Sequence, residues 1–224
     1  MSRLESIVGA LQQFYGALPS PPHDPFCLFV WEVLSVHSTP RKRDAAFGAL
    51  RRIRALTPDA MSRAPKKKLE DSVALAGSYT EQRLDALKTG VDRFRRSPAL
   101  ARVIQGPVTK ARRALTGLPQ MGDGGSHRML LFAADRAVMP VDTGISRVAR
   151  RLEFGGQPLS SARAIRVMLT AALEPDVEAF RRTFLYLSHH AAATCTDASP
   201  HCTICPVSHD CPHRQRQLHD ISDR

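Results

Sequence analysis

The sequence predicts an all-α fold for this chain of 224 residues. Three observations lead to that prediction. Apolar residues recur every three or four positions along most of the chain, which is typical of amphipathic helices. No segment shows a convincing strand-like alternation, and helix-capping residues, glycines and prolines separate the periodic segments. The hydrophobic fraction of 43% and the charged fraction of 24% are ordinary for a globular protein.

The first half of the chain divides into several predicted helices. An amphipathic helix is expected over residues 4–18, and a proline-rich linker at residues 19–25 ends it. Residues 26–36 are apolar on nearly every side, which indicates a buried central helix with Cys27 as a small core residue. The further helices of this half are expected over residues 45–56, from Thr57 onward, and over residues 67–76, 80–94, 98–104 and 108–115.

A tight glycine-rich turn is predicted over residues 118–125, followed by a helix over residues 126–134. Glycines at the start of a helix leave backbone N–H groups free to hold a phosphate, although an ordinary helix corner has the same appearance. Asp142 is a natural N-cap for a helix that runs to Leu152. The last two predicted helices cover residues 161–173 and 176–193, and the second leads directly into Cys195.

The strongest local signal is a group of four cysteines near the end of the chain. Cys195, Cys202, Cys205 and Cys211 follow the spacing C-x6-C-x2-C-x5-C, among residues that offer little apolar surface. Such a loop needs something other than hydrophobic packing to order it, and a metal centre is the simplest answer. Only Cys202 and Cys205 form a close couple, which favours a 4Fe–4S cluster over zinc. The alternative is a set of unrelated or disulfide-bonded cysteines.

The chain is strongly basic, with a formal net charge of +11 and an isoelectric point near 10.1. Such an imbalance favours a polyanionic partner, most simply double-stranded DNA, with a membrane surface as the lesser alternative. Any single basic cluster can be a solvated helix face, but together they favour nucleic acid. The clusters are Arg41, Lys42 and Arg43; Arg51, Arg52 and Arg54; Lys66, Lys67 and Lys68; Arg93, Arg95 and Arg96; Lys110, Arg112 and Arg113; and Arg147, Arg150 and Arg151.

Nothing in the sequence predicts a membrane protein. The longest apolar run, residues 26–36, is interrupted by Glu32 and is too short to span a bilayer. The first residues lack the charged-then-apolar layout of a signal peptide. We therefore expect a cytoplasmic, monomeric protein whose cysteines are metal ligands and not disulfides.

Several motifs together resemble a known family. The three gaps between the four cysteines, the turn Leu118-Pro-Gln-Met-Gly122 and the segment Val141-Asp142-Thr143 with its following arginines all match one pattern. Upstream, the helix that begins at Pro25 and the turn Gly77-Ser-Tyr79 match it as well. On these residues the chain resembles the endonuclease III family of helix-hairpin-helix DNA glycosylases along nearly its full length.

The resemblance implies two helical domains on either side of a DNA-binding cleft. Residues 25–141 would form a helical barrel with the helix-hairpin-helix near 107–134, and residues 1–24 with 142–224 would form the domain that holds the 4Fe–4S cluster in the loop 195–211. Such enzymes flip a damaged base out of the duplex. Asp142 would be the catalytic carboxylate, which stabilises the charge on the sugar or activates the nucleophile. The residues expected to contact DNA are His37, Ser78, Gln120, Gly122, Gly125 and Arg147.

The departures from the family pattern bear on the chemistry. The catalytic lysine of bifunctional members would stand two residues after the hairpin glycine, where this chain has Gly124. Gln120 replaces a hairpin glycine, which should stiffen or reshape the phosphate site. His37 stands where a glutamine often fills the gap left by the flipped base. Ser78 replaces a bulky wedge, which should weaken strand separation.

Three hypotheses follow from these residues. The first is a monofunctional DNA N-glycosylase of base-excision repair, in which Asp142 acts with water as the nucleophile. The second is a DNA-binding or lesion-sensing protein without catalysis. The third is a residual bifunctional glycosylase and lyase that uses another amine. The sequence leaves the identity of the damaged or mismatched base open.

Overall fold

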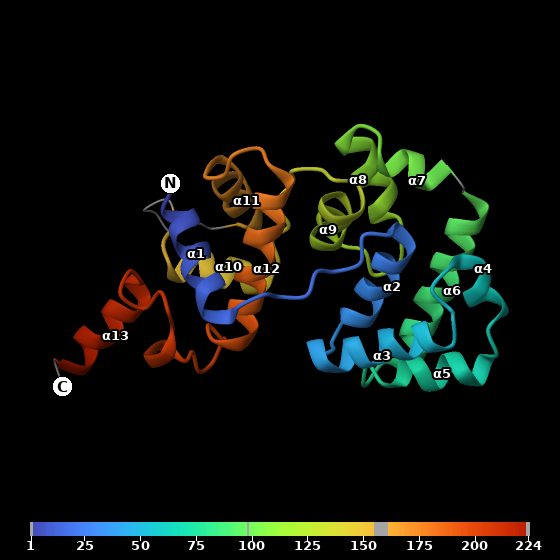
Figure 1. Cartoon of the computed structure of the whole chain (residues 1–224), viewed down its shortest axis with the longest axis horizontal. Helices are drawn as coiled ribbons and strands as arrows, with labels where there is room; N and C mark the ends of the chain where they lie inside the picture. Colours follow the sequence, from blue (N-terminus) through green and yellow to red (C-terminus); the bar gives the residue numbers. More distant parts are fainter. Residues whose placement is uncertain (1, 98, 155–160, 223–224) are drawn as a thin grey trace. The chain divides into compact units, whose positions relative to one another are not determined.

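The computed structural model describes residues 2–97, 99–154 and 161–222. Its described residues form α-helices and one short 3-10 helix and contain no strands, so the predicted all-α class is confirmed (Figure 1). None of the helices in these ranges is both long enough and apolar enough to cross a membrane. The chain divides into two compact units, Pro21–Asp135 and Met1–Ser20 with Arg136–Arg224. The division into functional domains at residues 25 and 141 stays a prediction.

The unit Pro21–Asp135 contains eight of the helices in the described part of the chain. Helix α2 is central to it, because it packs against α3, α6 and α9. Helices α3, α5, α6 and α4 adjoin one another in turn, and α7 and α8 lead into α9. The bounds are α2 Pro25–Ser35, α3 Pro40–Arg52, α4 Pro58–Arg63, α5 Lys66–Ala74, α6 Thr80–Arg96, α7 Ala99–Ile104, α8 Val108–Thr116 and α9 Asp123–Ala133.

The other unit joins the start of the chain to its end. Helix α12 packs against both α1 and α10, and α10 also packs against α11. Close packing of α10 on α12 requires Gly144, since a Cβ there would lie 2.9 Å from the Cβ of Ala191. The bounds are α1 Arg3–Tyr15, α10 Thr143–Arg151, α11 Ala162–Ala171, α12 Val177–Ala193, the 3-10 helix Cys202–Ile204 and α13 Pro212–Ser222.

Helix α2 is buried as predicted. Asp24 caps it by accepting the N–H of Cys27 at 2.8 Å, and Pro25 occupies its first turn, where no N–H is needed. Its residues with no exposed surface are Leu28, Phe29, Val30, Val33 and Leu34. Cys27 is only half-buried, and its thiol donates to the carbonyl of Leu56 at 3.4 Å. Burial raises the pKa of that thiol to about 12, so it is an inert group.

Some predicted helix boundaries were wrong. Helix α3 begins at Pro40, before the predicted start at 45, because the Thr39 hydroxyl accepts the N–H of Lys42 and caps it. Helix α1 ends at Tyr15, where Gly16 adopts a positive φ, and not at 18. Helix α13 and the 3-10 helix follow Cys195 and had no periodic signal of their own. The predicted helix start at Pro98 lies outside the described residues.

Candidate active site and cysteine loop

The hairpin turn is shorter than the sequence predicted. Helix α9 already begins at Asp123, so Gly124 and Gly125 lie in its first turn and the turn itself ends at Gly122. Gly122 is the N-cap, and its carbonyl accepts the N–H of Ser126 at 2.9 Å. Gln120 adopts a positive φ of 57° without being a glycine, which is uncommon and indicates local strain. The hairpin therefore keeps its left-handed turn although the expected glycine is missing.

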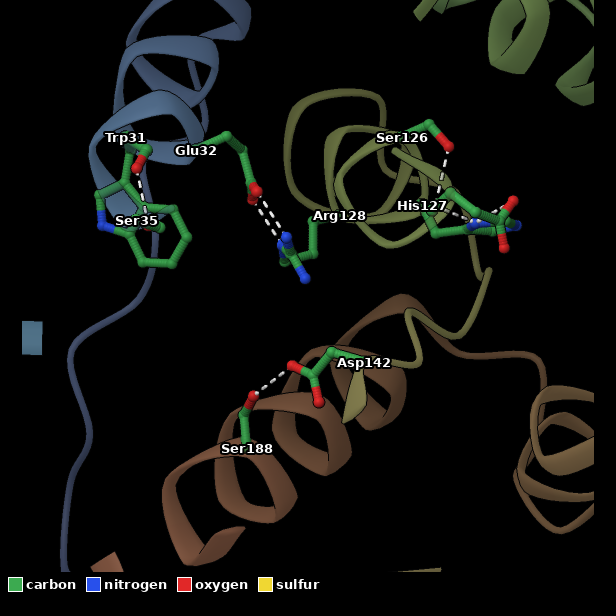
Figure 2. A network of polar contacts seen from close by, with 9 residues as sticks. Trp31, Glu32, Ser35, Ser126, His127, Arg128, Asp142 and Ser188 are labelled. Carbon is green, nitrogen blue, oxygen red and sulfur yellow. Dashed lines mark hydrogen bonds and ion pairs between the residues drawn. The ribbon is translucent and has the colours of Figure 1, made fainter. Parts of the chain in front are cut away.

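Gly125 is required for close packing beneath the hairpin. A Cβ at this position would lie 2.7 Å from the sulfur of Met121 and 3.4 Å from Oε2 of Glu32. Glu32 belongs to α2 and is buried, and Arg128 of α9 donates to both of its carboxylate oxygens. Figure 2 shows the two side chains facing each other. In the sequence Glu32 interrupts an apolar run, and a carboxylate inside such a run signals a paired buried charge.

The first turn of α9 carries further buried polar groups. The Ser126 hydroxyl donates to the carbonyl of Asp123 at 2.8 Å, and Nδ1 of His127 lies 2.6 Å from the same oxygen (Figure 2). Both side chains are buried. The start of α9, which would receive a phosphate, is therefore fixed in two ways. Ser126 and His127 contact the Asp123 carbonyl, and Gly125 permits close packing against Met121.

A buried arginine joins the two loops that carry His37 and Ser78. Arg83 is 1% exposed, and its guanidinium donates to the carbonyls of Gly77 and Ser78 on one loop. It also donates to the carbonyl of Val36 at 2.6 Å and to that of His37 at 3.5 Å on the other loop. A planar guanidinium can serve several acceptors at once, which a lysine cannot. Burial lowers the pKa of this arginine.

The same two loops present an exposed pair of rings. His37 and Tyr79 both adopt a positive φ, 50° and 71°, which is unusual for such side chains. Their ring centroids lie 5.2 Å apart, and Tyr79 is 53% exposed. Ser78, which precedes Tyr79 in the chain, is exposed, and its carbonyl accepts a hydrogen bond from Arg83. Strained backbone of this kind persists only where surrounding contacts hold it, and Arg83 provides those contacts.

Replacing Arg83 by methionine should destabilise the protein by about 3 kcal/mol, because four backbone carbonyls would lose a charged donor. Urea denaturation measures the effect. Arg96→Met on the same helix is the control, since Arg96 is exposed and its ion pair with Asp92 spans 4.0 Å. That change should alter stability by less than about 0.5 kcal/mol. Equal effects of the two substitutions would show that Arg83 does not hold the loops.

Asp142 caps the start of α10, as predicted. Its Oδ1 accepts the N–H of Ile145 at 2.7 Å, and its Oδ2 accepts the hydroxyl of Ser188 on α12 at 3.3 Å. Figure 2 shows Asp142 and Ser188 joined in this way. The carboxylate is half-buried, so both of its oxygens have a fixed orientation while part of the group stays accessible. A negative group at a helix N-terminus is also favoured by the helix dipole.

Arg147, one turn further along α10, has partners within its own unit. It donates to the carbonyl of Cys195 at 2.9 Å and to that of Ala191 at 2.8 Å. These bonds satisfy carbonyls at the C-terminal end of α12, where the helix has no N–H donors left. The structure thus gives Arg147 a role in fixing the start of the cysteine loop, residues 195–211. Its predicted contact with DNA stays a prediction.

All four predicted cysteine ligands line one pocket, together with Arg151, Leu152, His190 and other residues. None of the four is in a disulfide. Burial raises the pKa of Cys205 to about 11 and also raises that of Cys211. Within the described ranges, no group of three or more Cys, His, Asp or Glu side chains is close enough to hold a single metal ion.

Arg151, which belongs to a basic cluster of the sequence, contacts the start of the cysteine loop. Its guanidinium reaches Sγ of Cys195 at 3.3 Å and donates to the carbonyls of Thr196 at 2.6 Å and Asp197 at 2.8 Å. An arginine beside a group of thiolates offsets part of their negative charge.

The chain was compared with known proteins, and no family model matches it. It is 24% identical over 215 residues to "Endonuclease III homolog 2, chloroplastic" of Arabidopsis thaliana. The alignment covers 93% of this chain and 53% of that protein. It is 34% identical over 97 residues to an adenine DNA glycosylase of Mycolicibacterium smegmatis. This alignment covers 42% of this chain and 32% of that protein. The chain thus spans about half, or less, of the length of these curated relatives.

Solved structures show the same fold. A trapped covalent endonuclease III–DNA intermediate superposes with a TM-score of 0.72 at 21% identity, over 96% of this chain and 97% of that one. A thermostable thymine-DNA glycosylase superposes with a TM-score of 0.69 at 19% identity, over 95% of this chain and 97% of that one. The chain is therefore endonuclease III-like in sequence and has the helix-hairpin-helix glycosylase fold of that family.

Proposed function

We propose that the protein is a monofunctional DNA N-glycosylase that removes a damaged or mismatched base from double-stranded DNA. The orientation of Asp142 is the observation that carries the proposal, because both oxygens of this half-buried carboxylate are held at a helix start. The names of the relatives, an endonuclease III homologue and an adenine DNA glycosylase, support it. The net charge of +11 suits a DNA partner. A monomeric state and a cytoplasmic location remain parts of the prediction.

The proposed chemistry needs one carboxylate and one water. As the bond between base and sugar breaks, positive charge develops on the sugar, and a nearby carboxylate stabilises that charge. The same group can accept a proton from the attacking water. The hydrogen bonds from Ile145 and Ser188 fix the Asp142 carboxylate before the reaction, so little reorganisation is needed.

The lack of a nucleophilic side chain at Gly124 supports a hydrolytic reaction. Bifunctional relatives would have a lysine at this position, and Gly124 lies in the first turn of α9. A Schiff base requires an amine, so covalent attack on the sugar is not expected here. Base loss without strand cleavage is the expected outcome.

The exposed pair His37 and Tyr79 is proposed to contact the DNA at the site of base flipping. An exposed aromatic ring can stack on a base and replace part of the lost base stacking. Tyr79 lies directly beside Ser78, which is too small to act as a wedge. Both ring-bearing residues have a positive φ, and the Arg83 contacts hold their loops in this strained conformation.

The cysteine loop is proposed to hold a 4Fe–4S cluster through Cys195, Cys202, Cys205 and Cys211. All four thiols line one pocket, and Arg151 lies beside Cys195, which fits a cluster of net negative charge. When bound, the cluster would tie the loop together and could exchange one electron. The cysteine loop, ordered by the cluster, would form part of the protein surface near the C-terminal end of the chain.

A panel of duplexes tests the function. Each duplex carries one lesion: an oxidised pyrimidine, a mismatched adenine or thymine, uracil or an alkylated purine. Base loss that appears as strand breaks only after hot alkali supports the proposal. Breaks without alkali, together with borohydride trapping, would support a bifunctional enzyme. Tight lesion binding without base loss from any duplex would support a lesion-sensing protein.

Replacing Gly124 by lysine should create a complex that borohydride traps on DNA, because the new amine stands where bifunctional relatives would carry theirs. Trapped complexes are counted on denaturing gels. Gly48→Lys is the matched control, since Gly48 is also a helical glycine of the same unit and a Cβ there meets only Arg52 at 3.6 Å. Equal trapping by both variants would contradict the assignment of position 124.

A further inference from the structure

A hydrogen-bonded chain of side chains ends at one of the four cysteine thiols. The Tyr15 hydroxyl of α1 lies 2.6 Å from Oγ1 of Thr194 and 2.8 Å from Nδ1 of His190. The other ring nitrogen of His190, Nε2, lies 3.8 Å from Sγ of Cys205. His190 and Thr194 are buried, and His190 also lines the pocket of the four thiols. The chain therefore connects the N-terminal helix to a proposed cluster ligand.

The direction of these hydrogen bonds follows from the chemistry of a thiolate. A cysteine that ligates iron is deprotonated, so its sulfur can only accept a hydrogen bond. Nε2 of His190 must then carry the proton that points at Sγ. In a neutral imidazole Nδ1 is therefore an acceptor, and the Tyr15 hydroxyl donates to it. The Thr194 hydroxyl in turn donates to Tyr15, so each member of the chain has a defined role.

We propose that His190, held by Tyr15, is a positioning residue that donates a hydrogen bond to the Cys205 ligand and raises the reduction potential of the cluster. The inference rests on the proposed 4Fe–4S cluster. Reduction adds negative charge to the cluster, and an N–H dipole aimed at a ligand sulfur stabilises that charge. Arg151 supplies another side-chain donor, at Cys195, so the sulfurs of Cys195 and Cys205 both face a side-chain N–H group.

The position of His190 makes this effect specific. Its neighbour His189 lies on the same helix but is exposed, and the centroids of the His189 and Tyr15 rings lie 4.6 Å apart. Of these two histidines, His190 has the hydrogen bonds to Tyr15 and to Cys205. A comparison of the two histidines therefore separates an effect on the cluster from a general effect of losing an imidazole.

The test measures the reduction potential of the cluster by protein-film voltammetry in the purified full-length protein, with iron content determined for each sample. The variants are His190→Leu, His190→Gln and Tyr15→Phe, and His189→Leu is the control. Loss of the donor in His190→Leu should shift the potential to more negative values. The glutamine amide can still donate, so His190→Gln should recover part of the shift. Tyr15→Phe should give a smaller negative shift, because it frees the imidazole to turn.

The outcomes distinguish this inference from the cluster proposal. If the wild-type protein contains no iron after purification and takes up none on reconstitution, both the cluster proposal and the role of His190 are overturned. Full iron content with unchanged potentials in His190→Leu and Tyr15→Phe would overturn only the role of His190. If His190→Leu does not retain its cluster, Tyr15→Phe decides the matter, because it removes one hydroxyl and keeps the ring. A negative shift in Tyr15→Phe that is absent in His189→Leu supports the inference.

Discussion

Replacing Asp142 by asparagine should lower the rate of base removal by about 100-fold to 10,000-fold, the range expected when an acid–base group is lost. The negative charge that stabilises the sugar disappears with this change. The fold should be retained, because asparagine caps helices about as well as aspartate and can accept the N–H of Ile145. Single-turnover assays on the duplex that the wild type processes best measure the rate, and thermal unfolding checks the fold.

Asp176→Asn provides the matched control for this experiment. Asp176 caps α12 in the same unit, and its Oδ2 accepts the N–H of Ala179 at 2.9 Å. The same substitution at an equivalent cap should leave base removal unchanged. If Asp142→Asn retains wild-type activity, Asp142 is a helix cap without a catalytic role. Equal losses in both variants would instead indicate that the change acts through the packing of α12.

Replacing Cys211 by serine should remove the cluster, so that iron falls from about four atoms per chain to a small fraction of that. Cys211 is buried, and its loop is rich in polar residues and prolines that offer little apolar surface for packing. The cysteine loop should consequently become sensitive to proteases, and the protein should unfold at a lower temperature. Iron analysis, the visible absorption of the cluster and limited proteolysis measure these effects.

Cys27→Ser is the control for the loss of a thiol. Cys27 lies in α2 of the other unit, and a serine hydroxyl can also donate to the carbonyl of Leu56. This variant should keep its iron and its protease resistance. Wild-type protein with one tightly bound zinc ion and no iron would contradict the cluster proposal. Full iron content in Cys211→Ser would remove Cys211 from the ligand set.

The helical fold was largely predictable because its signals are local. Periodic apolar residues identified the buried helix α2, and the Asp142 cap was read correctly from its sequence context. Boundaries were less predictable. The glycines at 124 and 125 suggested a turn, but they lie inside α9, where Gly125 is needed because Met121 and Glu32 leave no room for a side chain. The sequence shows that residue 125 is a glycine, but only the positions of Met121 and Glu32 in the structure show why a glycine is needed there.

The candidate site was predictable only in part. The spacing of the four cysteines was sufficient to group them, because they lie within one short segment of the chain. The partners of Arg147 and Arg151 at the start of the cysteine loop were not predictable, since Cys195 and Thr196 lie 48 and 45 residues further along the chain. The basic cluster on α10 therefore contains side chains with specific structural roles.

The sequence by itself determined the all-α class, the resemblance to the endonuclease III family, the cysteine set and the missing lysine at Gly124. Only the tertiary structure decided which polar groups meet. Arg83 and Val36 are 47 residues apart, Glu32 and Arg128 are 96 apart, and Tyr15 and His190 are 175 apart. Helical periodicity and caps act over a few residues, so they cannot indicate such pairs. These contacts depend on how the helices of each unit pack, and they determine how its loops and ligand residues are held.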